Sequence, residues 1–180
     1  KPNPVYEEAG FVYFNTHYYG GIKKYQWTTI PLSIHGVIVK TDGEKITLNI
    51  GEDENDPIFT ITDLLPHLAS EQMKKTLSNG IEGEDLDLLI GSRPYKDESV
   101  SEKVKLNILK LLNDKYGITE KDFLSAELEL VPAFKARSLG FDSSMVAAYG
   151  QDDKVCCYTA LRALIDMKEI PEKTSVLILS

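Results

Sequence analysis

The polarity pattern of residues 149–168 predicts a helix that is apolar on nearly every side. After the opening turn GQDD, the plainly polar positions are Lys154, Thr159, Arg162 and Asp166. A helix of this kind is normally buried inside a protein. The Asp pair of the turn then stands at the helix N-terminus, where the helix dipole favours a carboxylate by roughly 0.3–1 kcal/mol. From the residues alone, an Asp in this place is an N-cap.

Alternating polarity and turn residues predict several antiparallel strands before this helix. The run 45–50 alternates between apolar and polar residues after an Asp-Gly turn, as in a half-exposed strand of a hairpin. Pro31 and Gly36 are expected to break the β-rich run 25–40 into two strands with a bend. Other expected strands lie at 11–14, 58–61, 85–90 and 125–131.

Two more segments have helical patterns. Residues 99–116 carry an apolar stripe, begin with a capping box from Ser99 to Glu102 and stop at Gly117. A short helix is expected around residues 70–79. The last part of the chain, 146–179, has the βαβ rhythm of a mostly parallel sheet, so the chain combines two architectures.

Composition narrows the function classes. The 180 residues are 42% hydrophobic and 27% charged, which is typical of a globular protein with one domain or two small ones. A net charge of −8 without a Lys/Arg cluster argues against nucleic acid as a partner. No apolar run approaches the roughly 20 residues of a membrane span.

The chain lacks an initial Met and stops after the strand-like run 175–179, so we expect a piece of a longer polypeptide.

Cys156 and Cys157 are the only cysteines, and they are adjacent on the predicted buried helix. A disulfide between neighbouring helical residues is not expected, because their side chains point in different directions. Free core thiols suit a reducing compartment, so the predicted location is cytoplasmic.

The segment GFDSSMVAAYGQDDKVCCYTALRAL at 140–164 resembles the bridging-ligand segment of the aminopeptidase I / aspartyl aminopeptidase family of dinuclear zinc peptidases. The segments KPNPVYE, THYYGGIKKYQW, IPLSIHGVIV and LLPHLA are also similar to the family, in the same order. The resemblance therefore covers most of the chain.

The resemblance implies an α/β fold, part of a metallo-aminopeptidase domain that is interrupted by an inserted β-rich dimerisation domain. Residues 1–19 and 133–180 would be pieces of the peptidase domain, and residues 20–132 would form the insert. Homo-oligomers, as dimers or assemblies of dimers, are the implied state, and peptides are the implied substrates.

The resemblance also assigns two site residues. Asp152 would bridge two zinc ions about 3.5–4 Å apart, although cobalt or manganese is not distinguished by the sequence. His67 would contact substrate or the reaction intermediate in a neighbouring subunit. A loop His with a backbone partner is the alternative for His67. The general base and the remaining metal ligands are expected outside this chain, so the fragment alone would be inactive.

The other candidate groups are given structural functions. His17 is expected in a packed aromatic cluster, and His35 in a strand bend. The acidic loop 51–57 lacks the spacing of a calcium-binding EF-hand and is expected to be solvated. The predicted function is that of a zinc aminopeptidase, and the alternative is a non-catalytic self-association module that pairs through the edge strands of residues 25–61.

Overall fold

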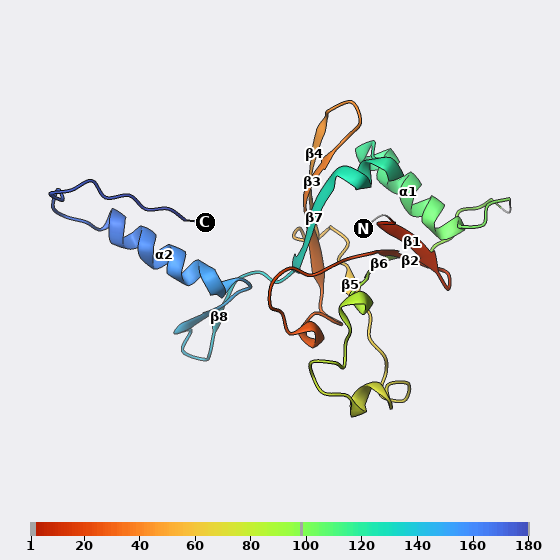
Figure 1. Ribbon diagram of the computed structural model, residues 1–180, viewed down its shortest axis with the longest axis horizontal. Helices are drawn as coiled ribbons and strands as arrows, with labels where there is room; N and C mark the ends of the chain where they lie inside the picture. The colour runs from red at the N-terminus through yellow and green to blue at the C-terminus, as the bar shows by residue number, and fades with distance from the viewer. Residues whose placement is uncertain (1–2, 98, 180) are drawn as a thin grey trace. The chain divides into compact units, whose positions relative to one another are not determined.

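The computed structural model describes residues 3–97 and 99–179, which form two compact units, Lys1–Ala133 and Phe134–Ser180. In the first unit, two antiparallel sheets lie next to helix α1 (Lys103–Tyr116) (Figure 1). The second unit contains one small hairpin and helix α2 (Gln151–Ile165). The expected mixture of sheets and a few helices is therefore confirmed.

The first sheet joins segments that are far apart in the sequence. Its strand order is β1-β2-β6-β5, and all neighbouring strands are antiparallel. The strands are β1 (Val5–Glu8), β2 (Phe11–Phe14), β5 (Thr60–Ile61) and β6 (Leu88–Gly91). The Tyr6 hydroxyl donates a hydrogen bond of 2.6 Å to Asp87 Oδ2 just before β6. This bond fixes the N-terminal hairpin to the residues that precede β6.

The second sheet has the order β4-β3-β7, again antiparallel. It contains β3 (Leu32–Val39), β4 (Lys45–Ile50) and β7 (Ala126–Pro132). The predicted break at Gly36 is wrong, because β3 runs through it. A Cβ at Gly36 would lie 2.0 Å from the carbonyl oxygen of Glu127, so the glycine permits a close approach of β7. Residues 25–30 form no strand; η1 (Lys24–Gln26) is a short 3-10 helix there.

Helix α1 begins later than its sequence predicts. The expected capping box at Ser99–Glu102 does not form, and Glu102 makes no side-chain capping bond. Instead, Glu7 of β1 accepts hydrogen bonds from the first N–H groups of the helix. Gly117, in the left-handed conformation with φ of 66°, ends the helix as predicted.

Three short 3-10 helices complete the first unit: η2 (Gln72–Lys74), η3 (Gly83–Asp85) and η4 (Glu120–Ser125). The expected helix at 70–79 is thus reduced to η2. At η4, Thr119 and Asp122 form a reciprocal cap, in which the Thr119 backbone N–H donates to Asp122.

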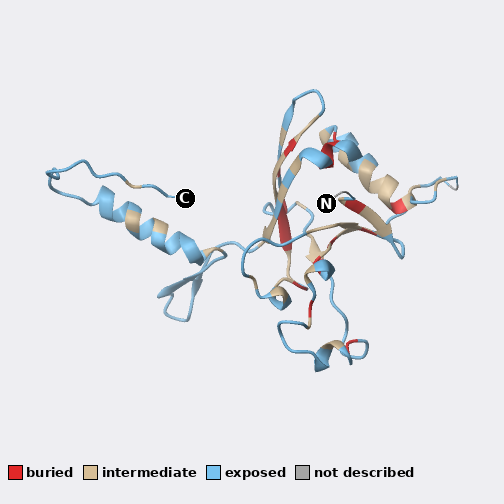
Figure 2. Cartoon of the chain, viewed as in Figure 1, coloured by how far each residue is buried: buried red, intermediate tan, exposed pale blue. Residues whose placement is uncertain are grey.

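The core of the first unit consists of two apolar clusters. One packs α1 and η4 against the β1–β2 hairpin and the inner face of β3 and β4, and the other packs β3 against β5 and β6 (Figure 2). Fully buried members are Val5, Val12, Leu32, Ile38, Leu88 and Ile118. The predicted alternation of β4 is confirmed, since Leu48 and Ile50 are buried and Lys45, Thr47 and Asn49 are exposed.

The second unit differs from its prediction. Strands β8 (Arg137–Leu139) and β9 (Met145–Ala147) form an antiparallel hairpin, and the described residues after α2, up to 179, contain no strand. The expected parallel βαβ arrangement is therefore absent from the described part of the chain. No residue of α2 is buried, contrary to the prediction of an internal helix. The physical reason is that one hairpin and one helix supply no second layer to cover the apolar faces of α2.

Candidate functional site

Asp152 lies at the entry to α2, where the backbone is not yet helical. Gly150 adopts the left-handed conformation with φ of 76°, and Asp152 and Asp153 both have non-helical φ and ψ angles. The peptide bond between the two Asp residues is cis. The side-chain amide of Gln151 donates a hydrogen bond of 2.9 Å to the carbonyl oxygen of Val146, at β9. The entry turn is thus tied to the preceding hairpin.

The two carboxylates of this turn have different surroundings. Among the described residues, the exposed Asp152 carboxylate has no hydrogen-bond or ion-pair partner. Asp153 contacts the thiol of Cys156, and the hydrogen bond and negative charge of Asp153 raise the pKa of that thiol. Neither carboxylate accepts a bond from a backbone N–H of α2 within residues 3–97 and 99–179, so neither acts as a side-chain cap.

The described residues contain no complete ligand set for the metal site that the resemblance implies. Within the described residues, no group of three or more His, Cys, Asp or Glu side chains is placed to hold a metal ion. Asp152 offers a single carboxylate, which suits one shared ligand of a two-metal site but cannot bind a metal by itself.

His67 lies at the corner of an exposed turn in the first unit. Leu65 is the acceptor of this turn, with its carbonyl oxygen 2.8 Å from the Leu68 backbone N and 3.0 Å from that of Ala69. Pro66 occupies the second position of the turn, where its fixed φ is favourable. Ala69 is only 3% exposed and anchors the segment, while the His67 side chain is exposed. His67 and Asp152 belong to different units.

The turn and the segment that follows it carry large apolar side chains that are exposed. Leu64 is 54% exposed, Leu65 67% and Leu68 71%. Further along the same segment, Met73 and Leu77 are 69% and 72% exposed. We call this set of five residues with His67 the His67 surface. Apolar side chains gathered on one exposed segment are typical of a surface that contacts another molecule.

The remaining histidines make no candidate site. His17 is exposed next to Tyr18 and Tyr19, which are 47% and 96% exposed, so the predicted packed aromatic cluster is wrong. His35 has a structural environment, as predicted, although it lies in a continuous strand. Its Nε2 is 3.2 Å from Ser33 Oγ and 3.1 Å from Glu52 Oε1.

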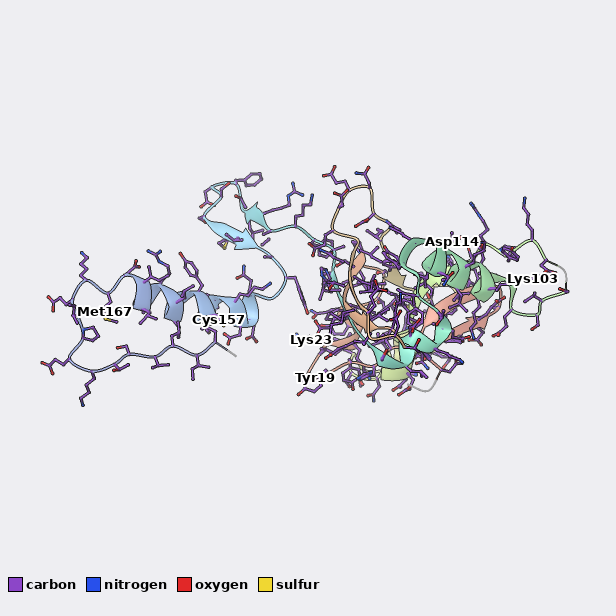
Figure 3. All side chains as sticks on the ribbon, turned by 90° about the horizontal axis from the view of Figure 1, so that it is seen from above. Tyr19, Lys23, Lys103, Asp114, Cys157 and Met167 are labelled. Carbon is purple, nitrogen blue, oxygen red and sulfur yellow. The ribbon has the colours of Figure 1, made fainter. Side chains whose placement is uncertain are left out.

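The expected solvated character of the acidic loop 51–57 agrees with its burial, since most of its residues are exposed. Its carboxylates bind its own backbone: Asp56 accepts from Gly51 N–H, and Asp53 from Asn55 N–H. The two cysteines of α2, of which Figure 3 labels Cys157, are free thiols as predicted, but Cys156 is exposed rather than buried.

The sequence pattern did not reveal the polar contact at the base of the turn that carries His67. Asp63 and Gln72 are joined by a side-chain hydrogen bond of 2.9 Å across the base of the turn. Polar residues in a loop carry no periodicity that would connect two positions nine residues apart. The spacing between Asp63 and Gln72 in the sequence therefore did not predict that their side chains meet.

Comparison with known proteins identifies the family. A family model described as "Aminopeptidase I zinc metalloprotease (M18)" matches residues 1–179. The fold is that of solved peptidases of this class: the M18 aminopeptidase of Thermotoga maritima aligns with a TM-score of 0.88 and 54% identity over 96% of this chain and 37% of that one. Aminopeptidase I of Clostridium acetobutylicum aligns with a TM-score of 0.85 and 56% identity, over 93% and 37%. The chain belongs to the M18 family.

Curated relatives of this chain are also M18 family aminopeptidases. A probable M18 family aminopeptidase 1 of Clostridium acetobutylicum is 59% identical over 179 residues, or 99% of this chain. The corresponding protein of Thermotoga maritima is 54% identical over 174 residues, or 97%. The chain spans about 38% of the length of these relatives. Neither α1 nor α2, nor any other helix of the described residues, has the length and apolar character that crossing a membrane requires.

Proposed function

We propose that the whole protein is a zinc-dependent aminopeptidase that removes N-terminal residues from peptides, in the cytoplasm. Membership of the M18 family supports a zinc peptidase. The observation that carries the proposal within this chain is the Asp152 carboxylate, exposed and unpaired among the described residues at the start of α2. A carboxylate in this state is free to accept cations.

Asp152 is proposed to be the ligand that two zinc ions would share. The two ions, or cobalt or manganese in their place, would polarise the scissile carbonyl and lower the pKa of a bound water. The backbone of the Gly150 turn and the bond from Gln151 to Val146 hold the entry in place. The general base and the other ligands are proposed to come from outside this chain, so the isolated chain would not hydrolyse peptides.

His67 is proposed to act across a subunit interface in a homo-oligomer. The exposed imidazole and the apolar His67 surface support this assignment, because exposed apolar side chains that lie together are typical of a contact surface. In a neighbouring active site, the imidazole would donate a hydrogen bond to the substrate carbonyl oxygen or to the oxyanion that forms from it. The division into peptidase segments 1–19 and 133–180 around an inserted domain 20–132 is part of the same proposal.

Replacement of Asp152 tests this function in the full-length protein. Asp152→Asn should remove bound metal, which elemental analysis measures, and lower kcat/KM for a peptide substrate by at least about 100-fold. Replacing a residue that only hydrogen-bonds to a metal ligand already lowers activity by up to about 100-fold, and loss of the ligand itself should cost no less. Asp166→Asn is the matched control, because Asp166 is an exposed carboxylate at the other end of α2, paired with Arg162. Full metal content and full activity in Asp152→Asn would refute the proposal.

Self-association is the second candidate function, for which the edge strand β4 and the His67 surface are the supporting observations. An edge strand leaves backbone N–H and C=O groups available to another chain. Sedimentation of the unit 1–133 tests this role directly. A strict monomer at high micromolar concentration would argue against it.

A further inference from the structure

The turn that carries His67 is closed at its base by one carboxylate. Asp63 Oδ1 lies 2.8 Å from the backbone N of Leu64 and 2.9 Å from Nε2 of Gln72, and both groups donate to it. The second oxygen, Oδ2, lies 3.5 Å from the hydroxyl of Thr28. Thr28 is 7% exposed and stands beside β5, so this contact connects the carboxylate to the body of the first unit.

These bonds enclose His67 in a ring of residues 63–72. Inside the ring, the Leu65 carbonyl accepts the two turn bonds. The Ala69 carbonyl accepts a bond of 2.8 Å from the backbone N–H of Met73, the residue just after the ring. Ala69 is the buried residue of the segment 62–79. Burial therefore fixes one point of the segment, and the Asp63–Gln72 hydrogen bond links the two ends of the ring through side chains.

We propose that Asp63 is a positioning residue for His67: with Gln72 it sets the direction in which the turn presents the imidazole. This inference rests on the proposed function of His67. Catalytic groups must be held to within about an ångström, since a displacement of that size lowers rates by up to about 100-fold. The Asp63–Gln72 bond adds a side-chain tie to the backbone bonds and the one buried anchor that hold this turn.

A swap of the two polar groups tests the tie in the full-length protein. Gln72→Glu places a second carboxylate against Asp63, which removes the donor and adds repulsion. Amide hydrogen exchange of the peptides covering 64–71 should then be about 2- to 10-fold faster, the effect of losing one hydrogen bond, and kcat/KM should fall about 10-fold. The double variant Asp63→Asn/Gln72→Glu restores a donor–acceptor pair and should recover both values to within about twofold. Ser70→Glu adds the same charge to the same exposed segment and serves as the control.

The background of His67→Ala separates positioning from a general structural effect. In that background Gln72→Glu should change kcat/KM by less than about twofold, because the group to be positioned is gone. A further loss there, or unchanged exchange or unchanged kcat/KM in Gln72→Glu alone, would overturn the inference. If His67→Ala lowers kcat/KM and Gln72→Glu does not, only the inference fails. If His67→Ala itself leaves kcat/KM unchanged, the proposed role of His67 fails with it.

Discussion

Glu7 of β1 caps helix α1 from a different element of the fold: its Oε2 lies 3.0 Å from the backbone N of Val104 and accepts a hydrogen bond from it. The same oxygen accepts from Lys105 N–H at 2.9 Å. A carboxylate at this place satisfies two N–H groups that have no partner within the helix and interacts favourably with the helix dipole. The bond also fixes α1 to the N-terminal hairpin, 97 residues earlier in the chain.

Removal of this cap should loosen the helix without unfolding the sheet. Glu7→Ala is expected to lower the free energy of unfolding by about 1–2 kcal/mol, the usual cost of losing a cap. Urea denaturation followed by circular dichroism measures the change. Glu8→Ala, on the exposed neighbouring position of β1, is the control and should cost less than about 0.5 kcal/mol.

A side chain at Gly36 should force β3 and β7 apart. The Cβ of Gly36→Ala would meet the Glu127 carbonyl oxygen at 2.0 Å, and the φ of 144° is itself unfavourable for alanine. We expect a loss of several kcal/mol, comparable to the most damaging substitutions. Gly21→Ala, where a Cβ meets nothing within 4 Å, should leave the thermal midpoint nearly unchanged. Equal midpoints for the two variants would contradict the close approach of the strands.

Asp122 should make stability depend on pH on the acid side. The hydroxyl and the backbone N–H of Thr119 donate to its carboxylate and lower its pKa. A carboxyl group whose folded pKa is below the unfolded value of about 3.9 stabilises the fold above that value, and the contribution disappears as pH falls through the folded pKa. The urea midpoint of Asp122→Asn should therefore be lower than that of the parent at pH 7 and approach it near pH 3.

Asp114→Asn provides the comparison for this pH series. Asp114 is exposed and pairs with Lys110 at 2.7 Å on the surface of α1. Exposed pairs of this kind contribute little to stability. The urea midpoint of Asp114→Asn should equal that of the parent at pH 7 and near pH 3. If Asp114→Asn lowers the midpoint at pH 7 as much as Asp122→Asn does, the bonds from Thr119 are not the cause of the pH dependence.

The His67 surface should be needed for self-association. Leu65→Asp and Leu68→Asp replace side chains that are 67% and 71% exposed, so the fold should tolerate both. In the full-length protein, we expect at least a tenfold rise in the dissociation constant of the oligomer, because burial of a leucine contributes about 1.5–3 kcal/mol. Analytical ultracentrifugation measures it. Leu124→Asp, a 73% exposed leucine in η4, is the matched control and should leave assembly intact.

The sequence pattern predicted correctly those features that depend only on neighbouring residues. The alternation of β4 and the glycine that ends α1 depend on neighbouring residues, and both are found as expected. The predicted start of α1 was wrong because the carboxylate that caps the helix belongs to Glu7, far from the local sequence around residue 100. The break at Gly36 was wrong because the glycine serves the approach of β7 rather than a bend.

The candidate site was predictable only through the resemblance. Polarity alone placed Asp152 at a helix entry, which the structure confirms, but its function as a metal bridge stays a prediction. The prediction that α2 is buried was wrong for this chain. Apolar residues on all sides of a helix indicate that it can be covered, but they do not indicate which part of the protein covers it. The ring around His67 depends on one side-chain pair, Asp63 and Gln72, which has no sequence periodicity.

The pairing of β2 with β6 affects how the chain can fold while the ribosome makes it. The β1–β2 hairpin gains its third strand only after β6 has emerged, and the Tyr6–Asp87 bond spans 81 residues. A lone two-stranded hairpin is marginally stable in water, and such distant contacts slow folding. During translation β2 therefore gains its pairing with β6 only after most of the first unit has been synthesised.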